Sequence, residues 1–249
     1  LQLTRLEYMD HTPTTMRIVD EFCYRAFDLK PDREYFIKTG TYSSKFDFRN
    51  AHVVGEKEVQ ELGEYLLFIH YQALCMAHYD LSSRKQPIIY GVSTTTEWVV
   101  REYIQPDPDT KEIYYGLPLR PEYRIFVDFD SGEIIGCSPY WEPKTMKKRF
   151  GHCEDSDDPD KVHDYIIYSA AEEELMEQYH KNIGNIAENL QKMIPEINLT
   201  GQWSMDIMQN KNDFYIIDMA PAETSALNEC VPAGKLKNQE EDWISRIGK

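Results

Sequence analysis

Two long stretches of this sequence carry apolar side chains every three or four residues, and they constrain the fold more than any other feature. The first covers residues 56–79 and the second residues 170–193, which Pro195 ends. Such spacing is typical of amphipathic helices that lie with one side on a sheet. Strand-like runs stand before and after each stretch. We therefore predict an α+β protein with two lobes, each an antiparallel sheet with a helix on one face.

Shorter apolar runs predict the strands. In the first half of the chain, residues 34–40 (EYFIKTG) and 97–106 (EWVVREYIQP) have the residue types of strands and are bounded by Gly or Pro. In the second half, residues 122–129 (EYRIFVDF) and 133–141 (EIIGCSPYW) flank the turn sequence DSG. We therefore expect the last two runs to pair as a hairpin.

A change in composition marks a boundary near Gln105, where a strand-like run meets Pro106 and a charged loop. Before the first predicted strand, the pattern indicates no more than a short helix. We expect four parts, namely an N-terminal segment at 1–32, a small lobe at 33–105, a large lobe at 106–227 and a C-terminal tail at 228–249.

The composition limits the partners that we expect. The 249 residues include 43 acidic and 27 basic side chains, a net charge of −16. Nucleic-acid binding requires clustered Lys and Arg, so we expect no nucleic-acid partner. No apolar stretch approaches the roughly 18 residues of a membrane helix, and the start lacks the pattern of a signal peptide. We expect a soluble, cytoplasmic protein with no membrane partner, whose five scattered cysteines form neither a disulfide framework nor a zinc site.

The hairpin sequence at residues 203–221 carries one acid in each apolar run, Asp206 and Asp218. If residues 211–213 form a three-residue turn, the two aspartates lie directly opposite each other. Facing like charges repel unless a cation lies between them, and carboxylate oxygens suit Mg²⁺. The alternative is a four-residue turn or a different bulge, which would point the aspartates to opposite faces as solvated charges.

Two lysines flank a loop that is rich in hydroxyl groups. Lys38 ends an apolar run, and Lys45 follows it after the sequence TGTYSS. The hydroxyl and backbone N–H groups of such a loop could hold phosphate oxygens while both lysines supply positive charge. The loop is not a Walker motif. The alternative for Lys38 is a plain charge at a strand edge.

The guanidinium of Arg124 stands within an apolar strand, where burial without an anionic partner would be costly. Either Glu122 or Asp128 on the same strand pairs with it, or a ligand phosphate does. The strand at 97–104 ends at the expected lobe boundary, where its backbone near Glu102 could meet a nucleobase, or it is an ordinary edge strand.

The order of these features along residues 33–225 resembles that of ATP-grasp enzymes. The resemblance is to the small, divergent ATP-grasp proteins of phages and bacteria and to the eukaryotic ATP-grasp chaperones that assemble an initiation factor. Their lysine-flanked loop and E-[FY]-R strand correspond here to KTGTYSSK and EYR. The resemblance implies two α+β lobes that hold ATP between them.

The same resemblance implies a role for each residue. It assigns phosphate contacts to Lys38, Lys45 and Arg124, adenine or ribose contacts to Glu102 and Ile104, and Mg²⁺ binding to Asp206 and Asp218, with Arg124 and Lys38 also catalytic. Many family members have an acid, any residue and then asparagine at the end of the last strand, whereas Ala220 stands here in place of the asparagine. Glu223 is the candidate for the third metal ligand, and its alternative is a solvated loop acid.

The function that follows from the resemblance is an ATP- and Mg²⁺-dependent ligase. A carboxylate would attack the γ-phosphate of ATP, and an amine would capture the acyl-phosphate, with Mg²⁺, the lysines and the arginine offsetting charge on the phosphoryl group. The acidic run at 154–160 could recruit a basic peptide or protein as substrate. One alternative is a nucleotide-dependent protein-binding or assembly factor of the same fold. Another is an acidic α+β domain that binds no nucleotide.

Overall fold

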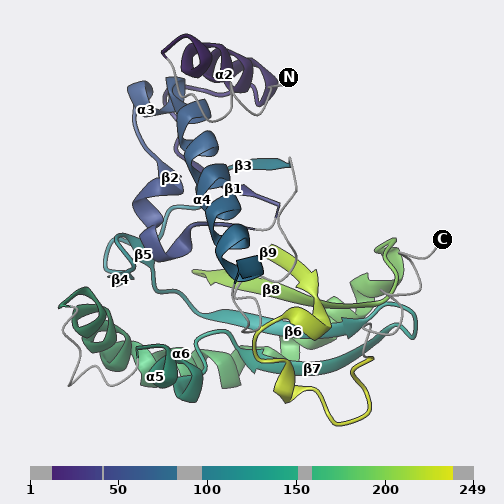
Figure 1. Cartoon of the computed structure of the whole chain (residues 1–249). Helices are drawn as coiled ribbons and strands as arrows, with labels where there is room; N and C mark the ends of the chain where they lie inside the picture. The colour runs from purple at the N-terminus through teal and green to yellow at the C-terminus, as the bar shows by residue number, and fades with distance from the viewer. Residues whose placement is uncertain (1–12, 41, 83–96, 151–158, 238–249) are drawn as a thin grey trace. The chain divides into compact units, whose positions relative to one another are not determined.

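The computed structural model describes residues 13–40, 42–82, 97–150 and 159–237 (Figure 1). The chain forms two compact units. The first contains the residues up to Gln105 together with 114–117, and the second contains 106–113 and the residues from Pro118 onward. Both units combine antiparallel strands with helices, so the predicted α+β class is confirmed. No helix in the described part of the chain combines the length and the apolar character needed to span a membrane.

The first unit has a three-stranded antiparallel sheet in the order β2-β1-β3. Its elements are α2 (Pro13–Ala26), β1 (Tyr35–Thr39), η1 (Lys45–Asn50), β2 (His52–Val53), α3 (Glu56–Gln60), α4 (Leu62–Ser82) and β3 (Trp98–Glu102). The single helix that we expected at 56–79 is therefore wrong, because the helix is interrupted at Glu61. The chain becomes helical again at Leu62, where α4 begins beside α2.

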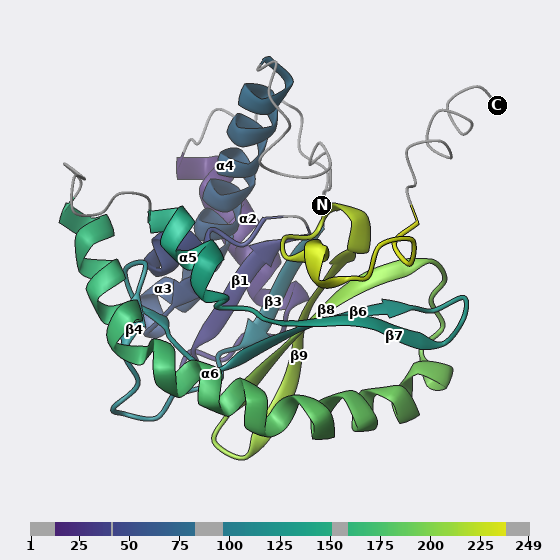
Figure 2. The same ribbon diagram turned by 90° about the horizontal axis from the view of Figure 1, so that it is seen from below.

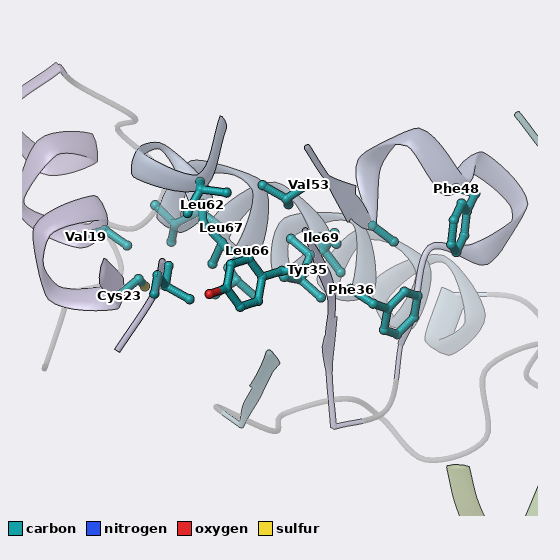
Figure 3. Close-up of a cluster of buried hydrophobic side chains, with 14 residues drawn as sticks. Val19, Cys23, Tyr35, Phe36, Phe48, Val53, Leu62, Leu66, Leu67 and Ile69 are labelled. Atoms are coloured by element: carbon teal, nitrogen blue, oxygen red, sulfur yellow. The ribbon is translucent and has the colours of Figure 1, made fainter. Parts of the chain in front are cut away.

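The core of the first unit lies where α4 packs on β1 and α2 (Figure 3). Leu62, Leu66 and Ile69 of α4 are fully buried. Tyr35 and Ile37 alternate with Phe36 and Lys38 along β1, and successive side chains of a strand point to opposite faces. Full burial of each large apolar side chain contributes roughly 1.5–3 kcal/mol to folding. Packing of α4 therefore fixes the direction in which every β1 side chain points.

A close contact between α2 and the start of α4 requires glycine at position 63. A Cβ atom there would lie 2.7 Å from Oδ1 of Asp20 and 2.8 Å from its backbone nitrogen. The same Oδ1 accepts a hydrogen bond of 2.9 Å from the backbone N–H of Glu64. Asp20 thus satisfies an N–H group in the first turn of α4, as a capping residue does, although it belongs to another helix.

The second unit has a four-stranded antiparallel sheet in the order β7-β6-β8-β9. Its strands are β6 (Glu122–Asp128), β7 (Glu133–Pro139), β8 (Gln202–Asn210) and β9 (Asp213–Pro221). Two short strands, β4 (Glu112–Ile113) and β5 (Leu117–Pro118), pair with each other where the chain passes from one unit to the other. The helices are α5 (Pro143–Phe150) and α6 (Pro159–Met193), with short 3-10 turns η3 (Ile194–Glu196), η4 (Ala222–Thr224) and η5 (Asn228–Cys230). The expected β6–β7 hairpin is confirmed.

Helix α6 runs along one face of this sheet (Figure 2). Its Ile186 and Leu190 pack against Tyr123, Ile125 and the neighbouring apolar side chains of that face. The helix begins eleven residues before the predicted start at 170 and ends at Met193, next to the 3-10 turn that contains Pro195. Because strand side chains alternate, the other face of β6 carries Arg124.

The C-terminal segment from 222 to 237, here called the strap, lies on that other face. Phe126 of β6 packs with Ala222 and Val231 of the strap. The strap passes so close to β7 that a Cβ atom at Gly136 would lie 2.9 Å from a methyl group of Val231. The strap therefore covers part of the face that α6 leaves open.

Polar contacts hold the end of the strap. Nζ of Lys237 lies 2.9 Å from Asp128 and 3.1 Å from Asp130, and the backbone N–H of Lys237 donates to Gln202 over 2.8 Å. Burial alone would raise the pKa of Asp128, but hydrogen bonds from Lys237 and Gln202 lower it overall. This end of the strap is therefore fixed to the β6–β7 turn by charge.

We predict that Asp20 makes the stability of the first unit depend on pH. Burial, aided by the charges of Glu64 and Glu61, raises the pKa of Asp20 from 3.8 to about 6. The folded chain then holds this proton more tightly than the unfolded chain, so the free energy of unfolding falls as pH rises through that window. Asp20→Asn keeps the acceptor for the Glu64 N–H but cannot titrate.

Urea unfolding at several pH values tests this prediction. The stability of Asp20→Asn relative to the wild type should increase between pH 3.8 and about 6. Asp20→Ala also loses the capping hydrogen bond and should be less stable than Asp20→Asn by about 1 kcal/mol throughout. A constant difference between Asp20→Asn and the wild type would contradict the raised pKa.

Candidate functional site

The β8–β9 hairpin places Asp206 directly opposite Asp218. The turn is formed by two residues, Lys211 and Asn212, rather than the three that we expected. A β-bulge then changes the register, because Ile207 pairs with Ile216 and Asp206 with Asp218. The bulge shifts the pairing by one residue, which offsets the turn being one residue shorter than expected. The facing pair is therefore confirmed, although the predicted turn is wrong.

Strand register extends this pair into a row of polar side chains across the whole sheet. Arg124 of β6 pairs with Asp206 of β8 on one side and with Ser138 of β7 on the other. The row Ser138, Arg124, Asp206 and Asp218 thus crosses all four strands, and residues that pair directly share a face of a sheet. The row lies on the face opposite α6.

At the centre of the row, Arg124 and Asp206 form a bidentate ion pair. Nε and Nη2 of Arg124 donate to the two carboxylate oxygens of Asp206, each over 2.7 Å. The side chains are only 13% and 9% exposed. Burial alone would lower the pKa of Arg124, but the hydrogen bonds and charge of Asp206 keep it above its ordinary value. Two parallel charge-assisted hydrogen bonds make this a strong and directional contact.

Two further contacts complete the environment of the guanidinium. Its Nη1 donates to the backbone carbonyl of Ala226 in the strap over 3.0 Å, and its carbon lies 4.9 Å from the ring centre of Tyr140. The direct ion pair is with Asp206 of the neighbouring strand and not with Asp128, which binds Lys237, while the charge of Glu122 contributes to the raised pKa of Arg124. The apolar run around Arg124 could not reveal a partner some eighty residues away.

Sequence reasoning missed Tyr140 and Ala226. Ser138 could have been found, because the predicted β6–β7 hairpin brings β7 beside Arg124. Ala226 could not, because any residue offers a backbone carbonyl.

The remaining predicted metal ligands lie at the edge of the sheet and in the strap. Asp218 is exposed, and its Oδ1 accepts a hydrogen bond of 3.0 Å from the backbone N–H of Met219. Glu223 lies in η4, and its Oε2 atom is buried without a hydrogen bond. Within the described ranges, no three acidic, histidine or cysteine side chains lie close enough to hold a metal ion. The structure thus joins the two aspartates but does not group Glu223 with them.

The two aspartates nevertheless provide some of the ligands that a hard cation requires. Asp206 and Asp218 both offer carboxylate oxygens, which Mg²⁺ prefers, and one or two carboxylates are a common protein contribution to its coordination. Both oxygens of Asp206 accept from Arg124 in this structure, so a cation would have to share or replace that partner. The metal role of these acids stays a prediction.

In the first unit, Lys38 lies on β1 opposite Val99 of β3, with its side chain half-buried on the sheet face shared with Phe36. Lys45 begins η1, and its Nζ lies 5.6 Å from the ring centre of Phe46. Both lysines have further interactions within the structure. Their roles as phosphate ligands stay predictions.

The loop between these lysines uses several of its hydroxyl groups for its own structure. Oγ1 of Thr39 accepts a hydrogen bond of 3.0 Å from the N–H of Tyr42, and the N–H of Thr39 donates to the Tyr42 carbonyl over 2.9 Å. Oγ of Ser44 donates to Gln72 of α4 over 3.0 Å, and Ser44 has a positive φ of 50°. These contacts fix the ends of the loop, while Thr41 lies outside the described residues.

The predicted adenine contacts lie at the end of β3. The carboxylate of Glu102 is exposed and accepts a hydrogen bond of 3.1 Å from Nη1 of Arg33. Between Glu102 and Ile104, the ring of Tyr103 lies 3.8 Å from that of His52, measured between centroids. This ring contact anchors the end of the strand. Neither it nor the ion pair tests the predicted role in nucleotide binding.

No model of a protein family matches the chain, and no curated protein matches it. Among solved structures, Cdc123 from Schizosaccharomyces pombe is similar, with a TM-score of 0.47 and 14% identity over 93% of this chain and 81% of that one. A C-terminally truncated form of the same protein gives a TM-score of 0.44 and 13% identity over 91% of this chain and 76% of that one. Neither is a phage or bacterial protein, and both likenesses are too distant to establish a family.

We predict that the Arg124–Asp206 pair is essential for the stability of the second unit. Arg124→Met leaves a buried carboxylate without its counter-ion, which should lower the free energy of unfolding by about 3–5 kcal/mol. The double variant Arg124→Met/Asp206→Leu removes both charges and should be more stable than Arg124→Met alone. Denaturant unfolding of the three proteins measures the effect.

Lys192→Met is the matched control. It breaks an exposed pair with Glu188 of 2.7 Å on α6 and should cost about 0.5 kcal/mol or less. If the double variant proves less stable than Arg124→Met, the pair is not the buried electrostatic unit described here.

Proposed function

We propose that this chain is a nucleotide-binding protein of the ATP-grasp type, which binds ATP with Mg²⁺ and uses it to hold a protein partner. The observation that carries the proposal is the row of Arg124, Asp206 and Asp218 on one face of the sheet. A cationic group beside two facing acids is the combination that a metal-bound phosphate requires. The family resemblance of the sequence supplies the identity of the ligand.

Each predicted residue then has a physical role. Asp206 and Asp218 would hold Mg²⁺, whose charge would offset that of the phosphates. Arg124 is bonded to Asp206 in this structure and would neutralise a phosphate oxygen where that bond is loosened. Lys38 and Lys45 would add point charges at the phosphates. Glu102 and Ile104 would contact the adenine or ribose, a role that rests on the resemblance alone.

Two observations favour partner binding over ligation. The last strand carries Ala220 where many ATP-grasp proteins have a metal-binding asparagine, and the structure does not group Glu223 with the two aspartates. The site therefore offers one metal ligand fewer than the resemblance implies for a ligase. The net charge of −16 favours a partner with a basic surface. The acidic run at 154–160 could recruit such a partner, and its residues 154–158 lie outside the described part of the chain.

A carboxylate–amine ligase is the second candidate. The two lysines and the arginine favour it, since they would offset charge on a transferred phosphoryl group without forming a covalent bond. Both candidates require bound ATP. They differ in whether ADP is released and in what triggers its release.

We predict that Mg²⁺-ATP stabilises the wild type in thermal unfolding. A ligand that binds only the folded chain adds about 2.7 kcal/mol at roughly 100 times its dissociation constant. Asp218→Ala should abolish most of this stabilisation, as should removal of Mg²⁺ with a chelator. Asp213→Ala is the control, because Asp213 is an exposed aspartate on the same strand and should respond like the wild type.

A wild type that does not respond to millimolar ATP would sink the nucleotide-binding proposal, as would equal losses in the two variants. Once binding is established, ADP formation separates the candidates. ADP that appears only when a carboxylate and an amine are both present identifies a ligase. Tighter binding of a basic protein with ATP, without ADP release, identifies the partner-binding factor.

A further inference from the structure

Helix α5 is short, but its packing in the second unit gives it a defined outward side. It begins at Pro143, a residue that suits the first helical position, and Oε2 of Glu142 accepts a hydrogen bond of 2.6 Å from the backbone N–H of Thr145. Met146 and Phe150, four residues apart, are buried, and the ring of Phe150 contacts tyrosine rings of α6. The opposite side of α5 therefore faces outward.

The outward side of α5 carries only positive charge. Lys144, Lys147 and Lys148 are exposed, and their spacing of three and four residues makes their side chains neighbours on the helix surface. We call these three lysines the basic face. Arg149 adds a fourth exposed cation, and α5 contains no acidic residue. On a chain with a net charge of −16, this helix forms a local surface of the opposite sign.

Other helices of the chain pair their lysines with acids. Lys192 of α6 lies 2.7 Å from Glu188, four residues before it, and Lys57 of α3 lies 3.7 Å from Glu61, four residues after it. In α5 the neighbours at these spacings are like charges, which destabilise a helix. Among the described residues, no acid forms an ion pair with a lysine of the basic face. An anion on this surface would relieve the repulsion.

The helix dipole accounts for only part of this charge pattern. The C-terminal end of a helix favours cations, which suits Lys147, Lys148 and Arg149 in the last turn. Lys144 lies in the first turn, where the dipole disfavours a cation. Burial alone would raise the pKa of Glu142, but hydrogen bonds and the nearby charge of Lys144 lower it overall. This single acid already caps the helix, so the basic face keeps a surplus of positive charge.

Acidic side chains near α5 limit the size of an anion that could bind there. Burial, followed by the charge of Glu172 of α6, raises the pKa of Tyr168, whose ring packs on Phe150 of α5. Exposed Glu173 and Glu177 follow along α6. A nucleic acid or an anionic membrane would extend beyond α5 and be repelled by these acids. The helix is about 12 Å long, which an extended segment of about four residues can cover.

We propose that the basic face of α5 binds a short acidic segment of a protein partner. Its carboxylates would pair with Lys144, Lys147 and Lys148 and remove the repulsion among them. Because the rest of the chain is acidic, this surface would also orient the partner as it approaches. The contact requires no nucleotide, so it goes beyond the proposed function and can hold or fail independently of it.

Nuclear magnetic resonance titration of the full chain with octaglutamate, at low ionic strength and without nucleotide, tests the proposal. The backbone N–H signals of α5 should shift, with binding at millimolar concentration or better. Added salt should weaken the binding, because it screens exposed ion pairs. The variant Lys144→Gln/Lys147→Gln/Lys148→Gln should bind about tenfold more weakly, the loss expected for three exposed ion pairs. This variant also loses the repulsion among the lysines, so its fold should be preserved.

Lys181→Gln/Lys192→Gln/Lys235→Gln is the matched control. It removes three exposed lysines of the second unit that lie outside α5 and gives the same net charge, so it should bind octaglutamate nearly as the wild type does. Absence of binding by the wild type would overturn the proposal, as would equal losses in the two variants. Tighter binding of α5 to single-stranded DNA or to anionic lipid vesicles than to octaglutamate would also overturn it, since the ligand would then be a nucleic acid or a membrane.

Discussion

The ion pair between Arg124 and Asp206 is the contact on which the second unit depends. It joins the two central strands of the sheet and buries two opposite charges on the face opposite α6. Such a pair is tolerated only where geometry is good and the remaining hydrogen-bonding groups are satisfied. The carbonyl of Ala226 meets that demand, which explains why the strap must lie on this face.

The two faces of the four-stranded sheet have different roles. On one face, Ile186 and Leu190 of α6 pack on Tyr123 and Ile125 in an apolar cluster. That packing fixes strand register, because a shift by one residue would turn every apolar side chain outward. With register fixed, the backbone already aligns the polar residues of the other face in a row. The packing of α6 on one face of the sheet thus stabilises the strand arrangement that holds the charged residues on the other face.

The sequence was sufficient for the longest strands and helices, apart from the break before α4, and for one part of the site. Helical spacing located most of α4 and α6, and the facing of Asp206 and Asp218 followed from strand parity. The register was right only because a bulge compensated for a shorter turn, and such compensations leave no clear sequence signal. The partner of Arg124 could not be predicted, because the pairing of β6 with β8 joins segments about eighty residues apart. The break before α4 arises from contact with α2 and is likewise non-local.

The proposed function requires that a metal-bound nucleotide lies against the row of Arg124, Asp206 and Asp218. Nuclear magnetic resonance of the arginine side chains tests this directly, with paramagnetic Mn²⁺-ATP compared with diamagnetic Mg²⁺-ATP. The account predicts that Mn²⁺-ATP broadens the Nε–H signal of Arg124 beyond detection while Mg²⁺-ATP leaves it visible. A signal that keeps its intensity at saturating Mn²⁺-ATP would contradict the account, since the metal would then lie far from Arg124.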